Sequence, residues 1–296
     1  MQEQLDLWTI LGILLGVGSL CGVWMYYFLR VQKYEPTMSS RKNALSSGYR
    51  VPTAAGQHDL DQHYDFELVN PTFGEPHEYT LFWLHGLGDV PSSWKEGTYS
   101  FHLKRTKIIL PAAPIMPVTL NSGMNMPAWF DINGLSIGAQ EDEIGIQAAC
   151  TQLARMIEHE ISEHDLNPLH VAVGGFSQGG ALALHTCLVE GYLQVQIGAV
   201  VGLSCWLPLG SNMMAKMHGN SPDSSSNIQL SKVNSTTPLF MGHGLDDPLV
   251  RLDYGETTFN VLIRNKSLFK RYRMTHETCT SELKDVGIFL KDVWNM

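Results

Sequence analysis

Ser177 is the residue of this sequence whose neighbours point most directly to chemistry. It lies in the string GGFSQGGALAL, with Gly175 and Gly179 two positions to either side. The apolar run HVAVGG before it is typical of a strand, and QGGALALHTCLVEG after it is typical of a helix. A sharp bend from strand to helix leaves no room for side chains beside the serine and presents its hydroxyl as a nucleophile. We therefore predict that Ser177 is a nucleophile.

The predicted nucleophile needs two partners, because a serine hydroxyl reacts only when a histidine accepts its proton and a carboxylate orients that histidine. After a serine at such a corner, the acid comes next along the chain and the histidine last. Asp246 and Asp247 in GHGLDDPLV are both candidate acids. His276 is the one histidine that follows them, so it is the predicted base. His185 and His243 precede the acids, and we expect structural roles for both.

A reacting carbonyl also needs backbone N–H donors for the negative charge that develops on its oxygen. One donor is the amide of the residue after the nucleophile, Gln178, at the start of the predicted helix. The second comes from a loop that follows an early strand. The glycine-rich string HGLGD, residues 85–89, follows the apolar run YTLFWL and is the predicted loop.

From residue 61 onward, short apolar runs alternate with longer helical stretches. The predicted strands are 79–85, 107–111, 169–176, 197–206, 237–244 and 268–274, and the predicted helices are 141–165, 178–191, 254–265 and 280–296. This alternation indicates an α/β protein with a mostly parallel sheet and helices on both faces, because parallel neighbours need crossover connections. The Ser/Asn-rich stretch 211–236 is expected to be a long loop.

Three acidic residues, Glu141, Asp142 and Glu143, begin the predicted helix 141–165. A helix dipole favours negative charge in the first turn. We therefore expect all three side chains to stabilise the start of this helix, rather than to form a paired-carboxylate site.

The composition of residues 61–296 narrows the possible partners. This part carries 25 acidic and 15 basic side chains, a net charge of −10, which argues against nucleic acid as a partner. The five cysteines, Cys21, Cys150, Cys187, Cys205 and Cys279, are an odd number with no CxxC pair, so we expect reduced thiols. No metal and no cofactor is predicted.

Residues 7–29, LWTILGILLGVGSLCGVWMYYFL, contain no charged side chain. At about 1.5 Å per residue, a helix of this length spans the roughly 30 Å core of a bilayer. The sequence therefore predicts a single transmembrane helix from Leu7 to Leu29, and its length and the acidic residues before it argue against a cleaved signal peptide. Five Lys and Arg residues lie between positions 30 and 50, so the positive-inside rule places the rest of the chain in the cytoplasm.

These features predict four segments. They are a short N-terminal segment 1–6, the transmembrane helix 7–29, a flexible linker 30–60 and a catalytic domain 61–296. The spacings of Gly12 with Gly16 and of Gly18 with Gly22 are GxxxG patterns, which let two membrane helices approach closely. A homodimer through this helix is therefore possible, and an ordinary small-residue helix is the alternative.

Strings along the whole catalytic segment resemble a known family. They are FWLHGLGD, LPAAPIMPVTLN, MPAWFDINGLS, QEDEIGI, GGFSQGGALAL, LSCWLPL and HGLDDPLV. In this order they resemble the blocks of the acyl-protein thioesterases, in the lysophospholipase/carboxylesterase group of α/β-hydrolases, over about residues 66 to 296. The resemblance implies the α/β-hydrolase fold for this segment.

The resemblance also implies roles for six residues. They are Ser177 as nucleophile, Asp247 as acid, His276 as base, Leu87 and Gln178 as oxyanion-hole amides, and Trp129 beside the active site, followed by a segment near the acyl chain. The implied activity is hydrolysis of fatty acyl thioesters on palmitoylated proteins through an acyl-enzyme. A lysophospholipase or a general carboxylesterase is the alternative within catalysis. A catalytically inactive scaffold is a further alternative, but the retained triad argues against it.

Overall fold

The structure is a computed structural model that describes residues 65–135, 139–217, 228–263 and 266–296. The predicted transmembrane helix 7–29, its GxxxG spacings and the linker 30–60 lie outside these residues. Within the four described ranges, no helix combines the length and the apolar character needed to cross a bilayer.

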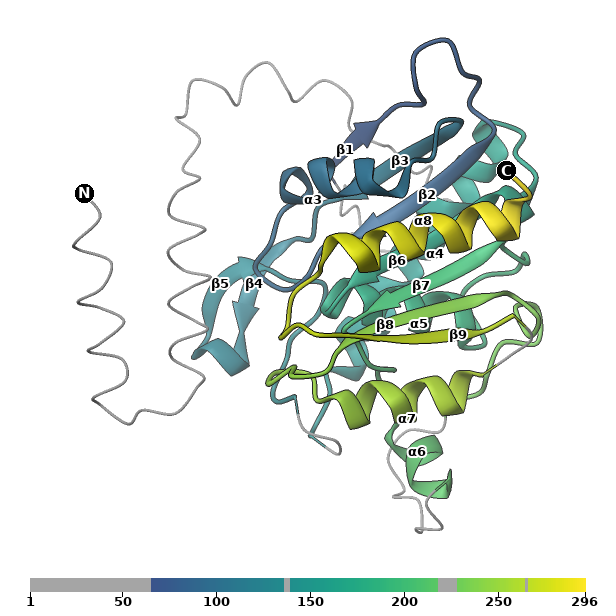
Figure 1. Ribbon diagram of the computed structural model, residues 1–296. Helices are drawn as coiled ribbons and strands as arrows, with labels where there is room; N and C mark the ends of the chain where they lie inside the picture. Colours follow the sequence, from purple (N-terminus) through teal and green to yellow (C-terminus); the bar gives the residue numbers. More distant parts are fainter. Residues whose placement is uncertain (1–64, 136–138, 218–227, 264–265) are drawn as a thin grey trace, which may run out of the picture. The chain divides into compact units, whose positions relative to one another are not determined.

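The core of the fold is a seven-stranded sheet in the order β1-β3-β2-β6-β7-β8-β9 (Figure 1). Its strands are β1 (Phe66–Val69), β2 (Tyr79–Leu84), β3 (Thr106–Pro111), β6 (Val171–Phe176), β7 (Ala199–Leu203), β8 (Leu239–Gly244) and β9 (Leu268–Tyr272). Every neighbouring pair is parallel except β1 with β3. The mostly parallel α/β-hydrolase sheet is therefore confirmed. A separate antiparallel pair consists of β4 (Ile115–Val118) and β5 (Met124–Pro127).

Helices cover both faces of this sheet. They are α3 (Pro91–Thr98), α4 (Glu143–Glu163), α5 (Gln178–Leu188), α6 (Ser211–Met217), α7 (Leu252–Leu262) and α8 (Thr280–Trp294). Successive side chains of a strand point to opposite faces. Accordingly, Leu81 and Trp83 of β2 pack with residues of α3 and α8, whereas Phe82 and Leu84 pack with residues of α4, α5 and α7. In Figure 1 the helices α3 and α8 lie on the near face of the sheet.

The sequence missed several short elements. Strand β1, the β4–β5 pair and helix α3 were not predicted from the apolar pattern. The expected loop 211–236 is wrong at its start, because residues 211–217 form α6, in which Met214 is buried. The strand predicted over 197–206 ends at Leu203, since Ser204 has a φ of 45° and turns the chain away from the sheet.

The expectation that three acidic residues stabilise the start of α4 is correct for two of them, Asp142 and Glu143, and wrong for Glu141. Asp142 is the N-cap residue, and its Oδ1 accepts a hydrogen bond of 3.0 Å from Gly145 N. Glu143 is in the first turn. Glu141, however, lies outside the helix, and its Oε2 accepts a hydrogen bond of 2.7 Å from Leu209 N. This carboxylate links the segment before α4 to the turn after β7.

Candidate active site

Ser177 occupies the corner between β6 and α5, with φ 51° and ψ −120°. A residue other than glycine rarely adopts a positive φ, so this corner holds strain. A Cβ atom on Gly175 would lie 2.6 Å from Leu84 O, and one on Gly179 would overlap the carbonyl oxygens of Leu84 and His85. Both flanking positions therefore require glycine, because the corner packs directly against the end of β2.

The structure brings Ser177, His276 and Asp247 into one hydrogen-bonded line. His276 Nε2 accepts from Ser177 Oγ at 2.8 Å, and His276 Nδ1 donates to Asp247 Oδ2 at 2.7 Å. Asp247 follows β8, and His276 lies between β9 and α8. The carboxyl ends of neighbouring parallel strands meet at one edge of the sheet, so residues 99 positions apart in the chain come into contact there.

The two candidate acids of the sequence differ clearly in their surroundings. Asp246 is exposed, whereas Asp247 is buried. Asp247 Oδ1 accepts hydrogen bonds from Leu249 N at 2.9 Å and from Val250 N at 3.0 Å, which leaves Oδ2 to face His276. The geometry therefore favours Asp247 over Asp246.

His243 lies behind this carboxylate and is fully buried. Its Nε2 donates to Val250 O at 2.8 Å and lies 3.6 Å from Asp247 Oδ2. Burial lowers the pKa of His243, and the hydrogen bond to Val250 and the Asp247 charge oppose this only in part. A neutral His243 therefore supports the loop that carries Asp247, in line with the structural role expected from the sequence.

The loop 85–89 packs against Ser177. A Cβ atom on Gly86 would lie 3.5 Å from Ser177 Cβ, so the residue before Leu87 packs against the serine. Gln178 N belongs to the first turn of α5, where amides have no partner within the helix and the helix dipole favours negative charge. The two amides expected for an oxyanion hole thus belong to residues that adjoin Gly86 and Ser177, which pack against each other.

Buried side chains hold this loop in place. His85 Nε2 accepts from Ala113 N at 3.1 Å, so its Nδ1 carries the proton and donates to Gly86 O at 2.8 Å. Burial lowers the pKa of His85, which keeps the ring neutral. At the far end of the loop, Asp89 accepts from Trp94 Nε1 at 2.9 Å. His85 was not among the residues predicted from the sequence, although it begins the string HGLGD.

Trp129 packs against His85, the first residue of this loop. Its ring is buried, and its Nε1 donates to His85 O at 2.8 Å. The Gln178 side chain is also fully buried, accepts from Trp129 N at 3.0 Å and donates to Phe130 O at 2.7 Å. These contacts fasten the segment after β5 to the first turn of α5. A substrate contact for Trp129 remains a prediction.

A small cavity lies beside this segment. It has a volume of about 20 Å³ and a mixed lining, in which Phe130, Ile132, Leu135, Trp206 and Tyr254 are accompanied by Asp131, Asn133, Gln140 and Glu141. The segment expected near an acyl chain therefore contributes both apolar and polar side chains to this wall.

One group of side chains in the described part of the chain has the composition of a metal site. His77, Glu160 and His164 bring their ligand atoms within 4.8 Å of one another at the opposite, amino-terminal edge of the parallel strands. Lys107 Nζ, however, donates to both carboxylate oxygens of Glu160 at 2.9 Å and to His164 Nε2 at 3.2 Å. The ammonium already neutralises Glu160, so we assign no metal to this cluster.

The parallel sheet, the serine at a strand-to-helix corner, the acid after β8 and the histidine after β9 define an α/β-hydrolase. The family model described as Phospholipase/Carboxylesterase matches residues 66–294. The chain belongs to this family, and it is a hydrolase of the thioesterase/carboxylesterase type.

Individual relatives agree with this family. Acyl-protein thioesterase 1 of Mycosarcoma maydis is 34% identical over 245 residues, which are 76% of this chain and 95% of the relative. Acyl-protein thioesterase 1 of Yarrowia lipolytica is 33% identical over 228 residues, 73% of this chain and 92% of the relative. The crystal structure of acyl-protein thioesterase 2 of Zea mays is 30% identical with a TM-score of 0.64, and the match covers 77% of this chain and 98% of that one.

Proposed function

We propose that this protein is a serine hydrolase that removes fatty acyl groups from the cysteines of S-acylated proteins. The observation that carries the proposal is the hydrogen-bonded line from Ser177 through His276 to Asp247 at the corner before α5. The relatives that are named acyl-protein thioesterases support the choice of substrate. No cofactor takes part, because the nucleophile, the base and the oxyanion donors all come from the chain.

In the first step, Ser177 Oγ forms a bond to the carbonyl carbon of the thioester while its proton moves to His276 Nε2. The negative charge of Asp247 stabilises the imidazolium that results and holds it in orientation. The carbonyl oxygen becomes an oxyanion, to which the amides of Leu87 and Gln178 donate. One such donor typically lowers the barrier by about 3 kcal/mol.

The carbon–sulfur bond then breaks, and His276 returns the proton to the departing thiolate of the cysteine. The acyl group is now an ester on Ser177 Oγ. A water molecule attacks this ester with His276 again as base, which releases the fatty acid and restores the serine. Phe130 and Trp206, two apolar side chains of this mixed lining, are the proposed contacts for the acyl chain.

Labelling with a fluorophosphonate probe tests the nucleophile. The full chain should be labelled, and the Ser177→Ala variant should not. Ser162→Ala, an exposed serine of α4, is the matched control and should be labelled like the wild type. A wild-type chain that resists the probe would contradict the proposal and favour an inactive scaffold.

A lysophospholipase or a general carboxylesterase is the second candidate, because the same triad also cleaves oxygen esters. Comparison of kcat/KM for an S-palmitoyl peptide and a lysophospholipid, with the full chain in detergent, separates the two. We expect the higher value for the thioester. A much higher value for the lipid would favour the second candidate.

We further propose that a helix over Leu7 to Leu29 anchors the catalytic domain to a membrane on its cytoplasmic side. The charge-free sequence and the Lys and Arg residues after it support this topology. Anchoring would keep the enzyme near lipid-modified substrates. The linker 30–60 would let the domain reach substrates at some distance along the membrane. Gly12 with Gly16 would allow two such helices to form a homodimer. Crosslinking of the full chain in vesicles tests the homodimer.

A glycosylation acceptor tests the side of the membrane. Asn234 begins the acceptor string NST, but it is buried and its Oδ1 accepts from Ile197 N at 3.0 Å, so it is a poor reporter. Asn70 is exposed, and Pro71 blocks its acceptor string NPT. The Pro71→Ala variant should remain without sugar in cells. The same variant fused after a cleavable secretory signal is the positive control and should be glycosylated. Glycosylation of the variant that lacks this signal would refute the cytoplasmic topology.

A further inference from the structure

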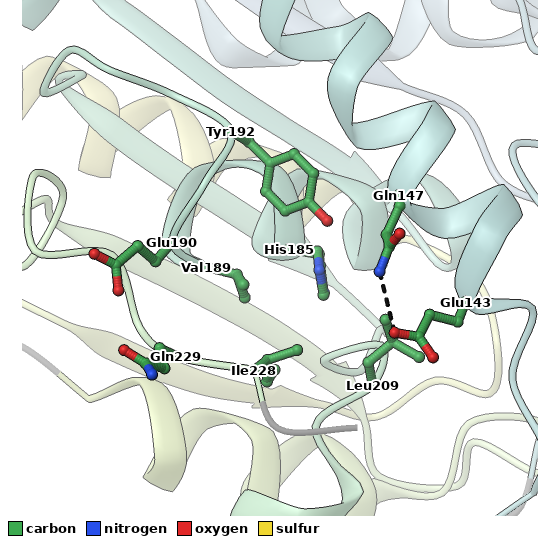
Figure 2. A pocket seen from close by; sticks show the side chains of 9 residues that line it. All are labelled: Glu143, Gln147, His185, Val189, Glu190, Tyr192, Leu209, Ile228 and Gln229. Carbon is green, nitrogen blue, oxygen red and sulfur yellow. Dashed lines mark hydrogen bonds between the residues drawn. The ribbon is translucent and has the colours of Figure 1, made fainter. Parts of the chain in front are cut away.

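A second pocket lies away from Ser177, between α4, α5 and the segment that follows α5. It has a volume of about 370 Å³, which is within the range of small-molecule sites. Its lining includes Glu143, Gln147, His185, Glu190, Tyr192 and Leu209 (Figure 2). His185 lies in α5, eight residues and thus about 12 Å along the helix axis from Ser177, the N-cap residue of that helix. The pocket is therefore separate from the candidate active site.

His185 forms part of the wall of this pocket. The ring is 1% exposed, and its Nδ1 donates to Pro208 O at 3.0 Å, so Nε2 is left as a hydrogen-bond acceptor. Among the described residues, Nε2 has no partner. Burial lowers the pKa of His185 to about 4, which keeps this acceptor free of a proton at neutral pH. A buried acceptor without a partner is costly unless a donor reaches it.

The charges around the pocket are negative. Glu143 and Glu190 lie on opposite sides of it in Figure 2, and Gln147 Nε2 donates to Glu143 Oε1 at 3.1 Å. None of the described lining residues is basic. Lys232 lies 3.7 Å from Glu190, but its side chain is 84% exposed and this contact contributes little. Glu143 and Glu190 are themselves exposed, so the pocket offers a ligand two carboxylates that face solvent.

Tyr192 supplies an aromatic ring between these carboxylates. Its ring centroid lies 5.5 Å from that of His185 in an edge-to-face arrangement. Burial and the charge of nearby Glu143 are among the causes that raise the pKa of the Tyr192 hydroxyl, so the side chain is neutral at working pH. An aromatic ring next to carboxylates is a combination that attracts organic cations.

We propose that this pocket binds an alkylguanidinium or alkylammonium group, whose charge lies between Glu143 and Glu190 and whose N–H reaches His185 Nε2. The alkyl part contacts Leu209 and the Tyr192 ring. Such a cation has two sources, a free amine and the basic side chain of a bound protein. Both present the same chemistry to the pocket.

Isothermal titration of the full chain in detergent with butylguanidinium tests the site, and butylurea serves as an uncharged ligand of the same size. We expect a Kd of about 1 mM or below for the cation and at least about tenfold weaker binding of the urea. The double variant Glu143→Gln, Glu190→Gln should lose at least about tenfold in affinity. Glu163→Gln, an exposed residue at the end of the same helix, should bind like the wild type.

Equal binding of the urea, unchanged affinity of the double variant, or no heat at concentrations up to about 10 mM would each overturn the proposal. Titration with N-acetyl-arginine methylamide then distinguishes the sources. Binding at least as tight as that of butylguanidinium indicates a protein side chain, and weaker binding indicates a free amine. Fluorophosphonate labelling of the same preparation reports on Ser177, so failure of this site and failure of the proposed function are separable.

Discussion

Trp129 Nε1 donates a hydrogen bond of 2.8 Å to the carbonyl oxygen of His85, the residue that begins the loop beside Ser177. The indole and the imidazole also pack together, with ring centroids 5.1 Å apart. A buried side chain of a different segment therefore holds the loop that contains the candidate oxyanion amide. The position of this loop, and therefore the direction in which the Leu87 N–H points, depends on this contact.

The Trp129→Phe variant should therefore lose activity. It removes the donor and leaves the buried carbonyl of His85 without its partner, at a cost of about 1 to 3 kcal/mol in stability. A loop displaced by even a small distance no longer directs its amide at the oxyanion, so we expect kcat to fall about tenfold or more while KM changes little. Steady-state kinetics on an S-acyl peptide measures both.

Trp294→Phe is the matched control for this variant. Trp294 is buried at the end of α8, and its Nε1 has no hydrogen-bond partner among the described residues. This change should reduce stability through packing and leave kcat close to that of the wild type. Equal losses of kcat in the two variants would show that Trp129 acts only through stability.

Asp247→Asn and Asp246→Asn should have very different effects. The amide of an asparagine at position 247 presents N–H groups to His276 Nδ1 and favours the wrong tautomer, so we expect kcat to fall roughly 10³- to 10⁴-fold. Asp246 is exposed and should tolerate the change within about twofold. Kinetic measurements on both variants check this, and a large loss at position 246 alone would transfer the role of the acid to that residue.

Gly179→Ala should unfold the protein or destabilise it by about 3 kcal/mol or more, because the added Cβ would overlap the backbone carbonyls of Leu84 and His85. Gly97→Ala, a glycine-to-alanine change within α3, is the matched control. An added Cβ there lies 3.7 Å from the Leu283 side chain, which is ordinary contact, and alanine favours a helix by up to about 1 kcal/mol. Urea unfolding compares the two, and a stable Gly179→Ala protein would refute the tight corner.

Glu141 should make stability depend on pH. Burial raises the pKa of its carboxyl from 4.5 to about 7, although hydrogen bonds from Leu209 and Trp206 oppose this. Folding therefore favours the protonated form of Glu141. The contribution of this group to the free energy of unfolding is full below pH 4.5 and is lost as the pH rises to about 7. The loss amounts to about 3 kcal/mol.

The Glu141→Gln variant keeps an acceptor for Leu209 N without the titration. Urea unfolding at pH 5 and pH 8 should show the wild type losing about 3 kcal/mol relative to this variant over that interval. Parallel changes in both proteins would contradict the shifted pKa.

The residues of the candidate active site were predictable because their chemistry imposes a local signature and a chain order. Gly175 and Gly179 mark the corner of Ser177 in the sequence itself, since no other residue fits there. One histidine follows the candidate acids, so order alone selects His276. The alternation of apolar runs likewise predicts the parallel sheet, because a strand buried on both faces must be apolar throughout.

Other features depend on contacts between segments far apart in the chain. The choice between Asp246 and Asp247 follows from the bend after β8, which buries one carboxylate and exposes its neighbour. Glu141 looks like a helix-start residue in the sequence, but it faces inward to Leu209. The short β4–β5 pair contains prolines and exposed apolar side chains, so it lacks the alternation that would predict it.

The sequence by itself thus determined the candidate nucleophile, the candidate base, the fold class and the charge-free segment 7–29, because each depends on residue type and order along the chain. Only the tertiary structure decided which aspartate faces His276, how Trp129 contacts His85 at the start of the loop 85–89, and that His185 borders a second pocket. Each of these contacts involves residues that are tens of positions apart in the chain, and only folding brings them together.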